Sequence, residues 1–178
     1  MKRALFFLLL AAASLCSQEP QVPRPATDFG IQTAPDKYIW LSQFRGKTVI
    51  VAIILTTCPH CQFTTGILNR IQKDYAPRGV QVLASAIEPM SALHIDDFRK
   101  ALAPPFPVGY NEESYAAKFL GRPEGDPMFM PQLAFVDTKG VIRAQFAGDA
   151  PGLKNEIQEK TLRDALEMTL KAGQAGGK

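Results

Sequence analysis

A long apolar run that passes directly into a helix signal constrains this chain more than any other feature. Residues 48–55 are aliphatic or β-branched throughout. Such a run is too continuous for a strand with one face in water, so we predict a central strand buried on both faces. Pro59 suits the first turn of a helix, where its missing N–H is not needed. Apolar side chains then recur at helical spacing, namely Phe63, Ile67, Leu68, Ile71 and Tyr75.

The rest of the pattern alternates strands with helices. Residues 80–87 form a second apolar run, so residues 48–87 have the form of a βαβ unit, whose two strands lie parallel. Two further strand-like runs, 132–137 and 141–147, are joined by a short glycine-containing turn and predict a hairpin. A last amphipathic helix is expected over residues 154–171. This alternation predicts an α/β protein.

The ends of the chain differ in composition from its middle. With 178 residues, of which 46% are hydrophobic, the chain has room for one domain. Residues 1–17 have the basic start, apolar run and small residues of a secretory signal. The apolar run of about 10 residues is roughly half of what a membrane-spanning helix needs. We expect a proline-rich linker over residues 18–37, the folded domain over 38–172, and a flexible tail over 173–178.

The predicted export and the charge distribution limit what this chain is expected to bind. Cys16, at the end of the predicted signal, would be a lipid anchor if the signal were of the bacterial lipoprotein type, although Leu15 stands where a small residue is usual. An exported chain could keep a disulfide between Cys58 and Cys61. The 20 basic and 17 acidic residues, net charge +3, are scattered through the sequence. They form no stripe for phosphate binding, so nucleic acid is not an expected partner.

The two cysteines lie at the predicted junction of strand and helix, in the sequence Cys58-Pro59-His60-Cys61. A two-residue gap brings both sulfurs within bonding reach on the first helical turn. The helix N-terminus stabilises an anion, which favours the thiolate of Cys58 as the attacking group, while Cys61 resolves the mixed disulfide. His60 would stabilise that thiolate further and make the pair a stronger oxidant, or it is a solvated histidine with no such role.

A zinc site and a structural disulfide account less well for the cysteine pair. Structural zinc needs four ligands, and besides the two cysteines the exported chain would offer only His60 and His94. We therefore expect no metal and no other cofactor. A purely structural disulfide stays open as an alternative.

A second candidate feature lies 70 residues further along the chain. Pro131 follows Met130 at the start of a predicted strand. An X-Pro bond can be cis at little cost, but the residues alone favour an ordinary trans bond there.

Taken together, the cysteine pair, Met130-Pro131, the hairpin and the terminal helix resemble the thioredoxin superfamily. The resemblance covers residues 38–171 and is greatest to the exported TlpA/ResA-like thiol–disulfide oxidoreductases, which have an AhpC/TSA-redoxin-like framework. Its most specific stretch runs from Trp40 to Lys47 and continues through the apolar strand into the cysteines. It implies a thioredoxin-like fold, in which helices flank a central mixed sheet.

The resemblance also implies an activity. The chain would exchange disulfides with cysteine-containing exported proteins and with a redox partner protein, in the periplasm or on the outer face of a bacterial membrane. Met130-Pro131 would be a cis bond facing the disulfide, with the Met130 backbone pairing to substrate. The Pro59-His60 gap is similar to that of disulfide-introducing enzymes, so the direction of exchange stays open.

Two positions depart from the family pattern. Thr57 precedes the first cysteine, where an aromatic residue is usual. The strand before it lacks the buried acid that accepts a proton in many thioredoxins, and Glu88, at the end of the next strand, either takes that role or is a surface carboxylate.

Two rival functions are compatible with this kind of fold. One is a peroxiredoxin-like peroxide reductase, although Val51 and Leu55 stand where that family has a proline and a threonine. The other is a copper-binding metallochaperone, although its relatives space their cysteines three residues apart.

Overall fold

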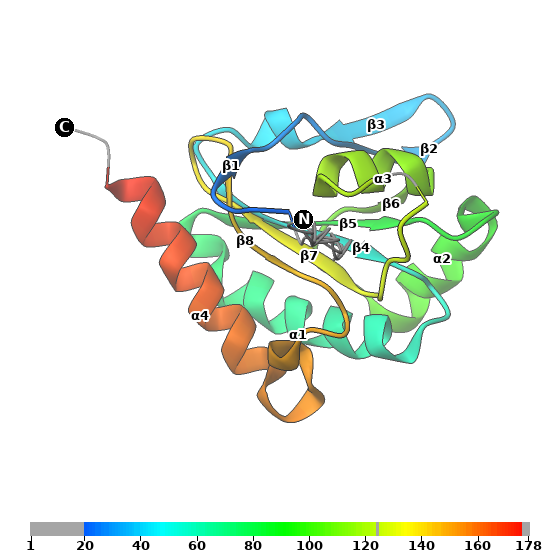
Figure 1. The fold of residues 1–178 in the computed structure, drawn as a ribbon. Coiled ribbons are helices and arrows are strands. Elements are labelled where there is room, and N and C mark those ends of the chain that lie inside the picture. Colours follow the sequence, from blue (N-terminus) through cyan, green and yellow to red (C-terminus); the bar gives the residue numbers. More distant parts are fainter. Residues whose placement is uncertain (1–19, 124, 176–178) are drawn as a thin grey trace, which may run out of the picture.

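A mixed sheet forms the centre of the computed structural model, which describes residues 20–123 and 125–175 (Figure 1). Within these residues the sheet has eight strands. In spatial order they are β1 (Arg24–Pro25), β8 (Val141–Phe146), β7 (Gln132–Val136), β4 (Thr48–Ile54), β5 (Val80–Ala86), β6 (Val108–Tyr110), β2 (Gly30–Ala34) and β3 (Lys37–Trp40). The predicted α/β class, a central mixed sheet flanked by helices, is confirmed.

Strand β4 lies in the middle of this sheet, as its composition predicted. All seven of its residues are buried, and it pairs parallel with β5 and antiparallel with β7. Successive side chains alternate between two separate hydrophobic clusters, with Ile50 in one and Val51 in the other. Burial on both faces explains why the strand carries no polar face in its sequence.

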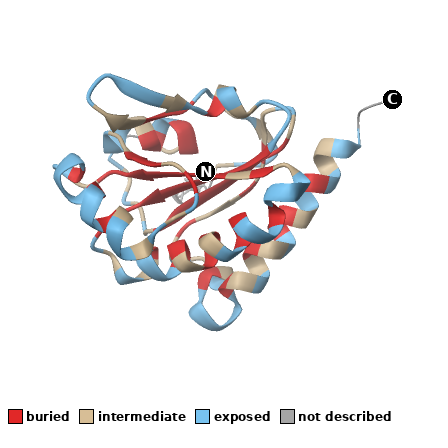
Figure 2. Cartoon of the chain, turned by 180° about the vertical axis from the view of Figure 1, so that it is seen from behind, coloured by how far each residue is buried: buried red, intermediate tan, exposed pale blue. Residues whose placement is uncertain are grey.

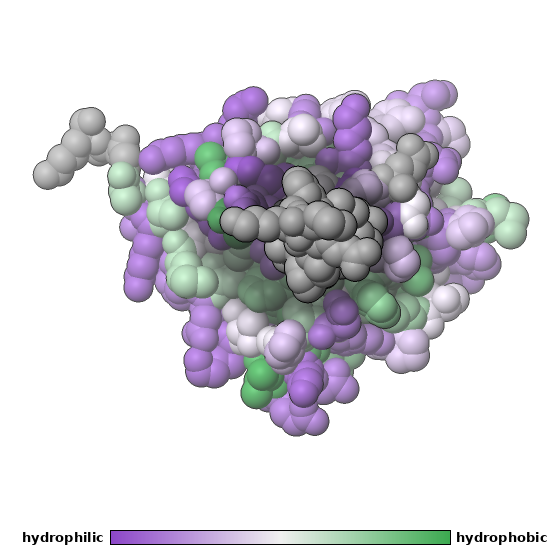
Figure 3. All heavy atoms as spheres, viewed as in Figure 1, coloured by the Kyte–Doolittle hydropathy of each residue, from purple (hydrophilic) through white to green (hydrophobic). Residues whose placement is uncertain are grey.

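Helices cover both faces of the sheet. On one face pack α1 (Pro59–Tyr75), α2 (Ser91–Leu102) and α4 (Asn155–Gln174), and on the other lies α3 (Glu113–Leu120) (Figure 1). The central strands and the inner sides of the helices are buried, whereas most of β3 and the outer sides of the helices are exposed (Figure 2). Hydrophilic side chains line much of the rim of the face in Figure 3. The predicted βαβ unit, hairpin and terminal helix are all present.

The N-terminal segment differs from the linker expected over residues 18–37. In the structure β1 pairs with β8, and β2 pairs with β3 and β6. Phe29 and Ile31 are fully buried, and the Phe29 ring packs on those of Tyr115 and Phe119, with centroid distances of 5.3 and 4.6 Å. Phe29 and Ile31 are therefore part of the hydrophobic cluster on the second face of the sheet, and the folded domain begins before residue 38.

Several expectations concern the chain ends. The predicted signal and Cys16 lie outside the described residues. Helix α4 continues to Gln174, one residue past the expected start of the tail, and residues 176–178 are also outside the description. In the part of the chain that is described, no helix is both long and apolar enough to cross a membrane.

Helix α1 differs in one detail from its predicted amphipathic pattern. Phe63 was expected on the core side, but it is 44% exposed, and Thr64 and Thr65 lie on the buried side instead. Gly66 lies in the middle of the same helix, and apart from the backbone of the helix itself and the two neighbouring residues, a Cβ atom built there meets no atom within 4 Å.

Replacing Gly66 with alanine should therefore stabilise the protein. Alanine restricts the unfolded chain and has the higher helix propensity, so we expect Gly66→Ala to raise the free energy of unfolding by about 0.5–1 kcal/mol. Urea denaturation measures this change. As a control, Gly109→Ala should destabilise, because its Cβ would lie 2.5 Å from the carbonyl oxygen of Gln32. Equal effects of the two substitutions would contradict the prediction.

Candidate active site

Three chain segments meet at the edge of the sheet where β4 ends. Cys58 follows β4, Glu88 follows β5, and Pro131 directly precedes β7. The strand register aligns these positions, because Ile54 pairs with Ala86 in the parallel ladder and Ile53 pairs with Gln132 in the antiparallel one. The predicted site residues therefore come together at one edge, although up to 73 positions separate them in the sequence (131 minus 58).

The two cysteines occupy different environments at the start of α1. Cys58 is the N-cap residue and is partly exposed, and Pro59 is the first helical residue. The thiols are not bonded to each other, and the Cys61 N–H donates to Cys58 Sγ at 3.4 Å. Cys61 is fully buried and its sulfur accepts the Leu55 N–H at 3.4 Å. An incoming disulfide can thus reach Cys58, whereas Cys61 is shielded from solvent.

The buried cysteine holds its proton strongly. Burial raises the pKa of Cys61 well above its usual range, and the negative charges of Cys58 and Glu88 raise it further. The Leu55 N–H acts in the opposite direction. Cys61 is therefore a neutral thiol near pH 7, and it needs a base before it can act as a nucleophile.

Glu88 is a carboxylate placed near that thiol. Its Oε1 accepts the backbone N–H of Thr56 at 2.9 Å and also the Thr56 hydroxyl. Its Oε2 is buried and has no hydrogen-bond partner in the described structure. A buried oxygen without a partner is unusual and requires an explanation. Thr56 was not singled out in the sequence, where it is one of several threonines and nothing marks it as an anchor.

His60 contacts the beginning of α4. Its Nε2 lies 3.0 Å from the carbonyl oxygen of Leu153 and 3.3 Å from Oε1 of Gln158. Leu153 closes the short helix η3 (Pro151–Leu153), and Leu153 and Gln158 are both buried. Neither was predicted, because 93 and 98 positions separate them from His60. His94, by contrast, is exposed on α2.

The Met130–Pro131 peptide bond is cis, and its backbone contacts Gly148. The Gly148 N–H donates to the carbonyl oxygen of Phe129 at 2.8 Å. A Cβ atom at residue 148 would lie 2.2 Å from the Met130 carbonyl oxygen, so a side chain cannot be accommodated without moving this segment. Gly148 was not predicted, although a glycine close to the end of a strand is a signal for a close backbone approach.

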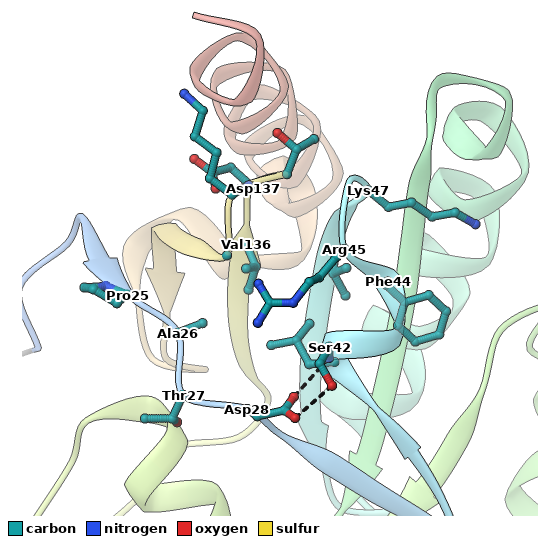
Figure 4. A pocket seen from close by; sticks show the side chains of 15 residues that line it. Pro25, Ala26, Thr27, Asp28, Ser42, Phe44, Arg45, Lys47, Val136 and Asp137 are labelled. Carbon is teal, nitrogen blue, oxygen red and sulfur yellow. Dashed lines mark hydrogen bonds between the residues drawn. The ribbon is translucent and has the colours of Figure 1, made fainter. Parts of the chain in front are cut away.

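A cavity of about 220 Å³ lies elsewhere, near the start of β4 (Figure 4). The Arg45 side chain points into it, and Asp28 accepts hydrogen bonds from the Ser42 N–H and hydroxyl there. No cysteine or histidine lines it. Seven residues of β4 at about 3.3 Å each separate it from the cysteines by roughly 20 Å, so it is not part of the candidate active site.

Among residues 20–123 and 125–175, no three His, Cys, Asp or Glu side chains lie close enough to hold a metal ion together.

Comparison with known proteins supports the fold. A family model described as Redoxin matches residues 21–166. A thiol:disulfide interchange protein of the thioredoxin family from Chlorobium tepidum superposes with a TM-score of 0.65 and 22% identity, covering 83% of this chain and 99% of its own. A hypothetical protein from Sinorhizobium meliloti gives 0.69 and 22%, over 88% and 87% of the two chains.

The thioredoxin domain of a thiol–disulfide oxidoreductase from Bacteroides vulgatus gives a TM-score of 0.61 with 16% identity, over 80% of this chain and 99% of its own. A search of curated proteins finds no match. At these identities the solved structures establish the fold, and the predicted thioredoxin-like fold is confirmed.

The raised pKa of Cys61 makes stability depend on pH. The folded protein keeps this proton to a higher pH than the unfolded chain, where the thiol titrates near its ordinary pKa of about 9. Above that pH the unfolded state binds fewer protons, so the thiol lowers the free energy of unfolding by up to about 1.4 kcal/mol per pH unit.

We therefore expect the stability difference between the reduced wild type and Cys61→Ala to shrink between about pH 8 and about pH 10. Denaturation at both pH values, with reductant present, measures it. A difference that stays constant with pH would show that Cys61 is not held as a buried neutral thiol.

Proposed function

This chain belongs to the Redoxin family, and we propose that it is an exported thiol–disulfide oxidoreductase that reacts through Cys58 and Cys61. The observation that carries the proposal is the unequal exposure of two free thiols on the first turn of α1. One sulfur can be approached from solvent, and the other is buried behind it. This arrangement suits disulfide exchange in two steps, because one accessible sulfur attacks the substrate and a second sulfur resolves the mixed disulfide.

In the first step the Cys58 thiolate attacks one sulfur of a substrate disulfide. The substrate S–S bond breaks, its other sulfur leaves as a thiolate that takes up a proton, and a mixed disulfide forms with Cys58. The N-terminal N–H groups of α1 favour the attacking anion, and the Cys61 N–H already points at Cys58 Sγ. The positive end of the helix therefore lies next to the reacting sulfur.

In the second step Cys61 resolves the mixed disulfide. The Cys61 thiol transfers its proton to Glu88, its sulfur attacks Cys58 Sγ, and the second substrate thiolate leaves. The chain is now oxidised and the substrate reduced by two electrons, and the reverse sequence introduces a disulfide. The buried, unpartnered Oε2 of Glu88 is available for the proton, and Thr56 holds the carboxylate through its other oxygen.

The substrate is proposed to lie along the Met130 backbone, as an extended segment of a cysteine-containing exported protein. Gly148 packs against this backbone without displacing it, because glycine has no side chain that would collide with the Met130 carbonyl oxygen. Phe129 lies next to Met130, and Ile157 lies next to Gln158, which contacts His60. Their side chains are 59% and 49% exposed and offer apolar area to a bound substrate. A redox partner protein would use the same surface to restore the pair.

Two alternatives lack support from the side chains at the site. Peroxide reduction of the peroxiredoxin type would need a hydroxyl at the position of Leu55 and a proline at that of Val51, which lies fully buried within β4. Copper delivery of the metallochaperone type uses cysteines spaced three residues apart, whereas two residues separate Cys58 from Cys61.

The decisive measurement is the reduction potential of the Cys58–Cys61 couple in glutathione buffers. We expect one two-electron couple in the wild type and none in Cys58→Ser. A potential near about −120 mV assigns disulfide introduction, and one near about −270 mV assigns disulfide reduction. Absence of a titratable couple in the wild type would overturn the proposed function.

Glu88→Gln tests the proton acceptor. Glutamine keeps an oxygen for Thr56 but loses the charge, so the pKa of Cys61 should fall while resolution of the mixed disulfide at neutral pH slows by about tenfold or more. Rapid quenching after mixing with a peptide disulfide measures the lifetime of the mixed species. Glu113→Gln, which removes an exposed carboxylate of α3, is the matched control. Equal lifetimes in the two variants would remove Glu88 from the mechanism.

A further inference from the structure

A closed ring of hydrogen bonds begins and ends at His60. The His60 ring contacts Oε1 of Gln158, the Gln158 Nε2 donates to the Thr64 hydroxyl at 2.8 Å, and that hydroxyl donates to the His60 carbonyl oxygen at 2.8 Å. Gln158 and Thr64 are both fully buried. A buried network in which every member has a partner holds its groups in one arrangement.

The direction of donation around this ring is fixed by its acceptors. A backbone carbonyl can only accept, so the Thr64 hydroxyl must donate to His60 and accept from the Gln158 amide N–H. The amide oxygen of Gln158 then faces the His60 ring. Leu153 presents a second carbonyl to the same ring nitrogen at 3.0 Å. With two acceptors facing it, Nε2 carries a hydrogen.

The segment that supplies Gln158 also contacts the backbone at Phe129 and Met130. Gly148 binds the Phe129–Met130 backbone, and ten residues later Gln158 binds His60. The segment crosses from the hairpin to α4 through η3, whose last residue, Leu153, is buried and also contacts the His60 ring. The orientation of His60 is thus tied to the same stretch of chain that packs against Met130.

We propose that Gln158 is a positioning residue that holds the His60 ring in one orientation and one tautomer, and that it thereby sets the reduction potential of the Cys58–Cys61 pair. The inference rests on the proposed function. His60 lies two residues after Cys58, in the first turn of α1. In the proposed arrangement the fixed ring stabilises the anionic Cys58 of the reduced form. When the ring is released, the reduced form loses this support and the couple becomes more reducing.

The test uses Gln158→Met, which keeps the length of the side chain without its acceptor. We expect its equilibrium constant with glutathione to shift about tenfold toward the oxidised protein, a change of about 30 mV for a two-electron couple. Gln158→Glu, which keeps an acceptor oxygen toward the ring, should return the potential toward the wild-type value. Should Gln158→Met fail to fold, Thr64→Val carries the same test, because it removes the anchor of the Gln158 amide.

Two comparisons separate positioning from a general loss of stability. Thr169→Val removes another fully buried polar group of α4, whose hydroxyl donates to the carbonyl oxygen of Ala165 in the same helix at 2.7 Å. It should lower stability and leave the potential unchanged. In a His60→Ala background, Gln158→Met should cause no further shift, because a residue that acts through His60 has nothing to position.

If the wild type shows a redox couple and Gln158→Met shows it at the same potential, this inference is overturned. The proposed function would still stand. A shift that persists in the His60→Ala background would also overturn this inference. Absence of any couple in the wild type would instead remove the proposed function itself, so the two failures are distinguishable.

Discussion

The position of the reacting groups depends on the burial of β4 between two hydrophobic clusters. Its seven residues have no polar face, so the strand cannot slide by one residue or turn over without exchanging two packed sets of side chains. The chain leaves the sheet at a fixed point as a result, and α1 begins at a fixed point. Cys58 becomes the N-cap of α1 because of this constraint, and the neighbouring strands bring Glu88 and Pro131 to the same edge.

The difference between the two sulfurs follows from their depth in this frame. One helical turn separates them, yet Cys58 is partly exposed while Cys61 contacts no solvent. Low polarity around Cys61 makes its ionisation unfavourable. The same burial strengthens the effect that the charges of Cys58 and Glu88 have on the pKa of this thiol. The packing around the two thiols thus gives them different access to solvent.

What the sequence allowed us to predict was local or followed from strand order. The 48–55 run and Pro59 mark a strand and helix by composition, and Glu88 could be proposed because parallel strands end at the same edge. The strands before residue 38 were missed because Phe29 and Ile31 are isolated apolar residues among prolines. Phe29 is buried through packing against aromatic rings of α3, which is far away in the sequence. Phe63 has the right spacing for the core but points away from it, because helical spacing alone does not fix the edges of a buried stripe.

Contacts between distant segments account for the rest of the site. Gly148, Leu153 and Gln158 lie within eleven consecutive positions, and no pattern in that stretch announces a role in chemistry at Cys58. Their function comes from where the hairpin and α4 place them, with Gly148 against the Met130 backbone and Gln158 against the His60 ring. A scaffold that fixes the cysteines through β4 can thus adjust their reactivity from a different part of the chain. Substitutions in this stretch can change the chemistry of the pair without disturbing the strand that positions it.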